Sequence, residues 1–234
     1  MPADVYQDDR FTKALYSVPD AARYLTLADS TLKVWVDGRP GFPKSGPLVT
    51  SIPSSGTYAQ QRIPFIGLAE AYVLKAFRLA GVPLQRIRPS LEILKAELGE
   101  HALASNRLFT DGAEVLWNLG SNAPEGTAEQ VSAMKLLVPR SGQYVFNEVV
   151  AAYLQRIAFS DGYARLIRLQ EYGDADVVLD PTRGYGRPIF DRAGVTVDNV
   201  FGALRAGDSI EDTAEDYGIE PEQLRNAWSL SLSA

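Results

Sequence analysis

The side chains of this 234-residue chain that are best suited to chemistry are basic, and they gather in one part of it. From Lys33 to Lys95 there are nine lysines and arginines but only three acidic residues. Cationic side chains at this density favour contact with nucleic acid, because neutralised phosphates release their condensed counterions. A solvated surface pattern is the alternative, and the local structure has to decide between the two.

A second set of cations lies near the other end, where Arg183 and Arg187 flank two glycines in RGYGRP. A guanidinium presents a planar fork of donors that matches a carboxylate in a bidentate way. Both arginines are therefore predicted either to pair with nearby acids or to dock onto an acidic site of a partner. The glycines are assigned to turn geometry, because Pro188 stands where a phosphate-binding loop would open a helix.

The composition disfavours most enzymatic chemistry. The chain has no cysteine and one histidine, His101, which excludes thiolate nucleophiles, disulfides and histidine pairs. We therefore expect no catalytic residue, no metal site and no cofactor. The sequence has no run of about 18 apolar residues to cross a membrane, and its N-terminus is acidic, unlike a signal peptide. A cytoplasmic protein that is not an enzyme is the expectation.

The basic stretch is predicted to start with two short helices. In SVPDAARYL, Ser17 is a candidate N-cap, Asp20 follows three residues later, and Pro19 lies in the first turn. The apolar seam between the two helices is predicted to consist of Ala22, Leu25, Leu27, Leu32 and Trp35. This seam leaves the polar side of the second helix on the surface.

The second helix and the hairpin after it supply the candidate DNA contacts. The stretch GPLVTSIPSSGTYAQQRI has the pattern of a hairpin the size of a wing, with its turn at 53–56. Two helices follow, the first stopped by Gly81 and the second, over 84–98, interrupted at Pro89. The candidate DNA-binding residues are Ser30, Thr31, Lys33, Arg39, Lys44 and Arg62.

In this order of elements, and in the run TLKVW after SVPDAARYL, residues 15–98 resemble the winged-helix DNA-binding domain of MerR-like regulators. Ala28 departs from the pattern, because Ser or Thr is the usual cap there. The resemblance implies operator binding, and the two-fold symmetry usual for winged-helix repressors predicts a homodimer. No long heptad helix follows, so the dimer contact is expected from residues 103–169 or from the C-terminal domain.

Residues 101–172 are predicted to form a mixed region. Asp111-Gly112 and Asp161-Gly162 each stand between short apolar runs, which predicts two hairpins. MKLLV is predicted to be a strand and residues 147–155 a short helix. A scaffold or a dimer surface is the expected role of this region, and a ligand pocket is the alternative.

The last segment combines a strand ending at Asp180-Pro181, a turn at 186–188 and a helix over 197–206 that Gly207 ends. With SIEDTAEDYGIEPEQLRNAW after them, residues 176–228 are similar to the small C-terminal domain of VapB-type antitoxins, and this resemblance implies a PIN-type ribonuclease toxin as partner. That final stretch has helix-turn-helix spacing, but its six acids against one arginine would be repelled by DNA, so it is expected to bind protein. The candidate partner-binding residues are Arg183, Arg187, Tyr217 and Trp228, with burial in its own domain as the alternative for Trp228.

Together these patterns predict an α+β fold in three parts. They are a MerR-like winged-helix DNA-binding domain at 1–100, a mixed α/β connecting region with short β-hairpins at 101–172, and an antitoxin domain with an acidic helix-turn-helix at 173–234. The predicted function is that of a type II antitoxin that neutralises its toxin and represses its own operon. A ligand-responsive winged-helix regulator without a toxin is the alternative. Truncation near Glu171 is expected to remove toxin neutralisation and to keep operator binding.

Overall fold

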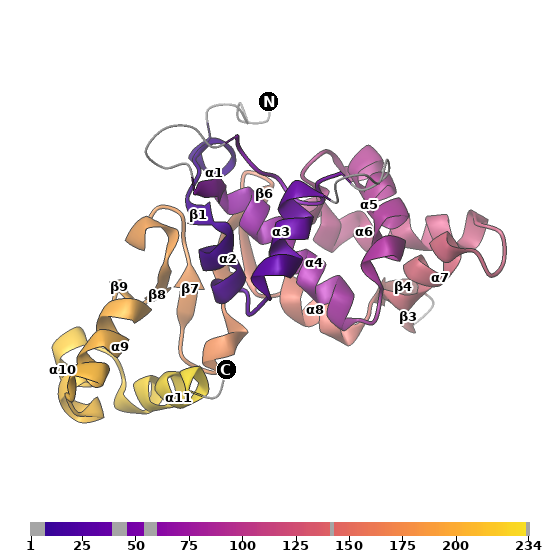
Figure 1. The fold of residues 1–234 in the computed structure, drawn as a ribbon. Coiled ribbons are helices and arrows are strands. Elements are labelled where there is room, and N and C mark those ends of the chain that lie inside the picture. Colours follow the sequence, from indigo (N-terminus) through magenta and orange to yellow (C-terminus); the bar gives the residue numbers. More distant parts are fainter. Residues whose placement is uncertain (1–7, 39–45, 54–59, 141–142, 233–234) are drawn as a thin grey trace.

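The computed structural model describes residues 8–38, 46–53, 60–140 and 143–232 (Figure 1). Its N-terminal half contains α1 (Asp9–Thr12), β1 (Tyr16–Ser17), α2 (Val18–Tyr24), α3 (Asp29–Asp37), β2 (Gln61–Ile63), α4 (Phe65–Leu79), α5 (Leu84–Leu98), the 3-10 turn η2 (Ala102–Ala104) and α6 (Asn106–Asn122). It continues with α7 (Ala128–Lys135), β3 (Leu137–Arg140), β4 (Gln143–Phe146), α8 (Glu148–Leu154), β5 (Ile157–Ser160), β6 (Tyr163–Arg168), η3 (Gln170–Tyr172), β7 (Val177–Leu179), η4 (Gly184–Gly186), β8 (Pro188–Phe190), β9 (Val195–Thr196), α9 (Val197–Ala206), α10 (Ile210–Tyr217) and α11 (Pro221–Ser231).

Helices α2 and α3 form the predicted N-terminal helix-turn-helix. The Ser17 hydroxyl accepts a hydrogen bond from the Asp20 amide at 3.2 Å and donates one to the Asp20 carboxylate at 2.6 Å. Ala28, the N-cap residue of α3, offers no side-chain hydrogen bond to the start of the helix. Leu32 and Trp35 have no exposed surface, so the predicted seam is part of the core.

Of the predicted wing, the structure describes the two arms but not residues 54–59. The Ile52 amide donates to the Arg62 carbonyl at 2.7 Å, which joins the arms at their base. The first arm, over 46–53, contains no strand, so the predicted pairing of two β-strands in the wing is wrong for the described residues. Strand β2 pairs instead with β1, with Tyr16 opposite Ile63. The first arm is fixed to α4, because the Thr50 amide donates to the buried Glu70 carboxylate at 2.5 Å.

The predicted interruption of the second helix at Pro89 is wrong. Helix α5 runs through Pro89 from Leu84 to Leu98. Pro89 stands early in the helix, so its ring removes one backbone hydrogen bond near the helix start. Burial of Ile87, Leu91 and Leu94 on one face offsets that loss.

The predicted hairpin at Asp111-Gly112 is also wrong, because these residues lie inside α6. The Ser105 hydroxyl caps this helix by accepting from the Arg107 amide at 3.2 Å. The buried positions of α6 recur every four residues, at Leu108, Gly112, Leu116 and Gly120. Gly112 serves close packing, since a Cβ there would come 2.8 Å from Leu108 and 3.2 Å from Phe146. Helical periodicity and tertiary packing thus outweigh the local turn signal.

The other predicted elements of this region are largely confirmed. Asp161 and Gly162, with φ of 53° and 84°, form the predicted tight turn between β5 and β6. Asn147 caps α8 as expected for the helix over 147–155. Of MKLLV, only the last residues are in a strand, because β3 starts at Leu137 and pairs with β4.

Strands β5 to β9 form one antiparallel sheet in the order β5-β6-β7-β8-β9. The sheet joins residues on both sides of position 172, since Ile167 of β6 pairs with Leu179 of β7. A chain cut near Glu171 would lose β7, β8 and β9 and expose the edge of β6. The expectation that truncation separates the two activities cleanly therefore does not fit this sheet.

The C-terminal helices follow the sequence pattern closely. Helix α9 ends at Gly207, and Gly218, with φ of 65°, makes the turn between α10 and α11. Ala214 and Leu224 are buried between α10 and α11. Figure 1 shows α2 and α3 near the centre, with the orange to yellow C-terminal part on one side and α5, α6 and α7 on the other. No helix within the described ranges is long and apolar enough to cross a membrane.

Candidate DNA-binding and partner-binding surfaces

In the structure, two of the predicted DNA-binding basic side chains meet at one carboxylate. The Lys33 ammonium on α3 donates to the Asp37 carboxylate at 2.7 Å, and the Arg62 guanidinium on β2 donates to its other oxygen at 2.5 Å. We call these three residues the Asp37 bridge. It ties the second helix of the helix-turn-helix to the strand that follows the wing.

The Asp37 bridge keeps one net positive charge at the surface. The hydrogen bond from Lys33, reinforced by that from Arg62, holds the pKa of Asp37 below its ordinary value although partial burial would raise it. The Lys33 side chain is 68% exposed, so it can exchange this carboxylate for another anion. Sequence reasoning missed Asp37, although its spacing of four residues from Lys33 on a helix is a signal that could have found it.

The other predicted DNA-binding residues fall into two groups. Ser30 is exposed and Thr31 half-buried near the start of α3, on the surface that also carries Lys33. Arg39 and Lys44 lie outside the residues that the structure describes.

In the C-terminal part, Arg183 is surrounded by carboxylates of its own chain. Its Nε donates to Asp180 at 2.9 Å, and its Nη2 and Nη1 donate to the Asp191 side chain and carbonyl at 2.5 and 3.0 Å. We call these three residues the Arg183 bridge. Local pairing, the alternative considered for Arg183, is what the structure describes, so its fork is already occupied.

The Arg183 bridge is built around a buried acid. Burial alone would raise the pKa of Asp180, but hydrogen bonds from Thr182 and Arg183 outweigh it and lower that pKa. The Thr182 amide and hydroxyl donate to the same Asp180 oxygen at 2.8 and 2.6 Å. This arrangement fixes the chain where it leaves β7 and enters η4.

The turn η4 presents its tyrosine to solvent in an unusual backbone conformation. Gly184, Tyr185 and Gly186 have φ of 55°, 54° and 74°, which is left-handed for all three. A non-glycine residue in this region costs about 1 kcal/mol. Tyr185 is 81% exposed, and the Arg187 guanidinium lies 6.0 Å from the centre of its ring. Unlike Arg183, the exposed Arg187 has no ion pair with any residue in the described part of the chain.

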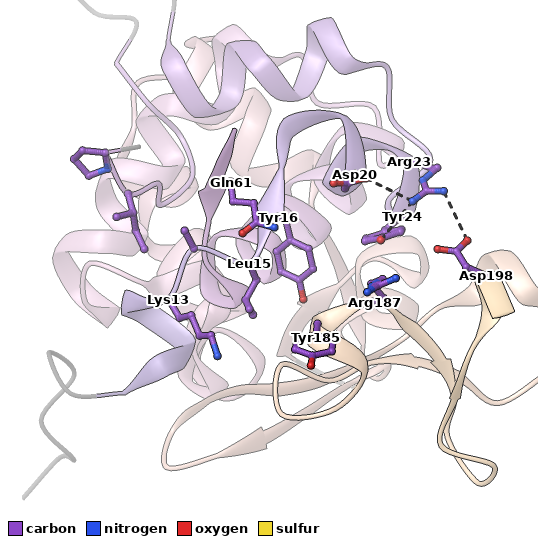
Figure 2. A pocket seen from close by; sticks show the side chains of 13 residues that line it. Lys13, Leu15, Tyr16, Asp20, Arg23, Tyr24, Gln61, Tyr185, Arg187 and Asp198 are labelled. Atoms are coloured by element: carbon purple, nitrogen blue, oxygen red, sulfur yellow. Dashed lines mark hydrogen bonds and ion pairs between the residues drawn. The ribbon is translucent and has the colours of Figure 1, made fainter. Parts of the chain in front are cut away.

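Turn η4 faces the helix-turn-helix across a cleft of about 870 Å³ (Figure 2). One wall is formed by the segment before α2 and by α2 itself, and the other by η4 and the start of α9. The lining includes Lys13, Leu15, Tyr16, Asp20, Arg23, Tyr24, Ile52, Tyr185, Arg187 and Asp198. We call this space the interdomain cleft. Sequence reasoning did not foresee it, because its two walls come from segments more than 120 residues apart in the sequence.

Contacts at the interdomain cleft hold the two walls together. A Cβ on Gly186 would come 2.6 Å from the Tyr16 hydroxyl oxygen, so only glycine permits this approach. Burial raises the pKa of Tyr16, whose hydroxyl is buried beneath the turn. Arg23 on α2 forms ion pairs with Asp20 at 3.5 Å and with Asp198 of α9 at 3.8 Å.

The remaining partner-binding candidates lie on the C-terminal helices. Trp228 is half-buried and packs edge-on against Phe201 with ring centres 5.0 Å apart, which agrees with the alternative of burial in its own domain. Tyr217 is also half-buried at the end of α10. Near Trp228, Leu230 and Leu232 expose apolar surface. Within the described ranges, no group of three or more His, Cys, Asp or Glu side chains is arranged to hold a metal ion.

Family models match two regions of the chain. Residues 14–91 match a family model described as "Putative DNA-binding HTH domain", and residues 177–230 match one described as "Protein of unknown function (DUF433)". The chain is 51% identical to the Mycobacterium tuberculosis protein named "Putative antitoxin VapB45", over 97% of this chain and 98% of that protein. It is 24% identical to "Uncharacterized protein Rv2308" of the same organism, over 97% of this chain and 94% of that protein. The X-ray crystal structure of Rv2018 from Mycobacterium tuberculosis is similar, with a TM-score of 0.87 and 52% identity over 94% of this chain and 99% of that one.

Proposed function

The chain belongs to the family of the Mycobacterium tuberculosis protein named "Putative antitoxin VapB45", and from that premise we propose that it is a type II antitoxin that neutralises a PIN-type ribonuclease by direct binding. In this proposal it also represses its own operon as a homodimer bound to operator DNA. The observation that carries the proposal is the 51% identity to that protein over nearly the whole of both chains. The match of residues 14–91 to a DNA-binding helix-turn-helix model supports the second activity.

In this proposal the N-terminal part binds DNA in the manner of MerR-like regulators. Helix α3 enters the major groove with Ser30 and Thr31 toward the bases, while Lys33 and Arg62 contact phosphates. The Asp37 bridge supports this assignment, because it places both cations at one edge of α3. Arg39 and Lys44 are proposed to add phosphate contacts.

The C-terminal part is proposed to bind the toxin through Arg187, Tyr217 and Trp228. Arg183 contributes indirectly, because its two carboxylate partners fix the turn that carries Tyr185 and Arg187. The acids of α10 and α11 are exposed, which keeps this second helix-turn-helix away from DNA.

Lys33→Ala and Arg62→Ala should each weaken operator binding and flatten the plot of log affinity against log salt by about 0.9 per lost phosphate contact. The measurement is a salt series of binding isotherms on the promoter of the chain's own operon. Arg107→Ala is the matched control, because Arg107, like Lys33, is an exposed basic side chain paired with an acid on its own helix, at 3.5 Å from Asp111. If Lys33→Ala and Arg62→Ala behave like this control, DNA is read elsewhere.

Toxin binding is tested by copurification of the tagged chain from its own host. The proposal expects a small PIN-type ribonuclease in equimolar amount, encoded beside the antitoxin and inactive in the complex. If none is recovered while operator binding persists, the alternative of a ligand-responsive regulator without a toxin takes its place. Light scattering of the operator complex at micromolar concentration tests the homodimer, and a monomer would contradict it.

A further inference from the structure

We propose that the interdomain cleft receives an acidic segment of the toxin, so that the toxin touches the helix-turn-helix and the C-terminal part at the same time. This inference rests on the proposed antitoxin function. It differs from the assignment of toxin binding to residues 173–234 alone, because one wall of the cleft belongs to the N-terminal part.

The lining of the cleft includes three basic and two acidic side chains. Arg23 forms ion pairs with both Asp20 and Asp198, and these three residues together carry one net negative charge. Lys13 and Arg187 are exposed, and no acidic residue within the described ranges forms an ion pair with either of them. Figure 2 shows Lys13 at one side of the cleft, Arg187 beside Tyr24 toward the other, and Tyr185 between these two cations. Two cations from distant parts of the chain therefore face one space that a carboxylate could enter.

The turn η4 is shaped to present side chains to that space. Tyr185 is held in a left-handed conformation between two glycines, and its ring remains exposed. A strained residue that the surrounding structure maintains is a reason to look for a binding role. Large aromatic rings and arginines are the residues that contribute most to protein interfaces. Tyr185 and Arg187 supply one of each within reach of the cleft.

The shape and lining of the cleft favour a protein segment over nucleic acid. At about 870 Å³ it is larger than one carboxylate needs, and Leu15, Ile52 and Tyr24 give it apolar walls. A polynucleotide carries a phosphate at every step and would have to pass Asp20 and Asp198, which repel it. A protein segment can place an Asp or Glu beside Lys13 or Arg187 and an apolar residue against these walls.

The test uses the copurified complex of the full-length chain with its ribonuclease. Lys13→Glu and Arg187→Glu should each weaken toxin binding by about tenfold or more, because a cation that paired with a partner's carboxylate then repels it. Arg192→Glu is the matched control, since Arg192 is an exposed arginine in the same segment as Arg187 but outside the lining of the cleft. The affinity is measured by titration of the toxin, with thermal unfolding of each variant alone as a check on folding.

The outcomes separate this inference from the proposed function. If the wild-type chain binds no ribonuclease, the proposed function fails and the inference with it. If toxin binds, but Lys13→Glu retains the affinity of the Arg192→Glu control, the toxin does not enter the cleft, whatever Arg187→Glu does. If a glutamate variant unfolds, Lys13→Gln and Arg187→Gln remove the charges without adding new ones, and unchanged affinity in both overturns the inference.

Discussion

The Asp37 bridge and the Arg183 bridge are three-residue ion-pair clusters with opposite charge ratios. In the helix-turn-helix a single carboxylate is shared by two basic side chains, whereas near the C-terminus a single guanidinium is shared by two carboxylates. The side chain of Lys33 is 68% exposed, but that of Asp180 is 3% exposed. An exposed ion pair contributes little to stability, while a buried charge that loses its partner is costly.

Because of this difference in burial, the Asp37 bridge can exchange its partners for other ions, whereas the Arg183 bridge fixes the backbone around it. Lys33 and Arg62 can leave Asp37 for a phosphate at small cost, which suits a DNA-binding role. If Arg183 left Asp180, it would leave a buried carboxylate without its charged partner, which is costly. Arg183 is therefore suited to holding η4 in position. Arg187, four residues later, is the arginine that remains available to a partner.

The largest effect is expected from breaking the Arg183 bridge. Arg183→Met should lower the free energy of unfolding by about 2 kcal/mol, less than for a fully buried pair because the arginine side chain is 37% exposed. Urea unfolding followed by the fluorescence of Trp228, in a variant that lacks the other two tryptophans, measures it. Arg192→Met is the control, and equal stability of the two variants would mean that the bridge is dispensable.

A smaller loss of stability is expected when the pH is lowered. The pKa of Asp180 is lowered on folding, so its stabilising contribution is complete above the unfolded value of about 3.9 and is lost as the pH falls through the lower folded value. Below about pH 4 the Trp228 signal should therefore change before that of Trp35, which is buried in the helix-turn-helix. In Arg183→Met this difference should shrink. Simultaneous changes at Trp228 and Trp35, each followed in a variant that retains only that tryptophan, would argue against an acid-sensitive C-terminal part.

The smallest effect on stability is expected at the Asp37 bridge. Asp37→Asn should change the free energy of unfolding by less than about 1 kcal/mol, because the ion pairs are exposed. The same change frees Lys33 and Arg62, so DNA affinity should rise severalfold and its salt dependence should steepen. Titrations with operator and with unrelated DNA measure both effects. Weaker binding by Asp37→Asn would show that Asp37 orients the cations rather than competing for them.

The sequence by itself determined the elements whose signals are local. Ser17 caps α2, Gly207 and Gly218 end α9 and α10, and Asp161-Gly162 turns the β5–β6 hairpin, as their residue types predict. Each of these signals acts within a few residues of the chain through a cap or a backbone conformation. Both helix-turn-helix patterns are therefore recognisable in the amino-acid sequence alone.

Only the tertiary structure decided which distant residues meet. The dipeptide Asp111-Gly112 has the same turn signal as Asp161-Gly162, but packing against Phe146 keeps it in a helix. The sheet that crosses position 172 and the cleft between Lys13 and Arg187 depend on contacts far apart in sequence. Such contacts form where apolar surfaces of whole elements are buried together, and no local pattern records which surfaces those are.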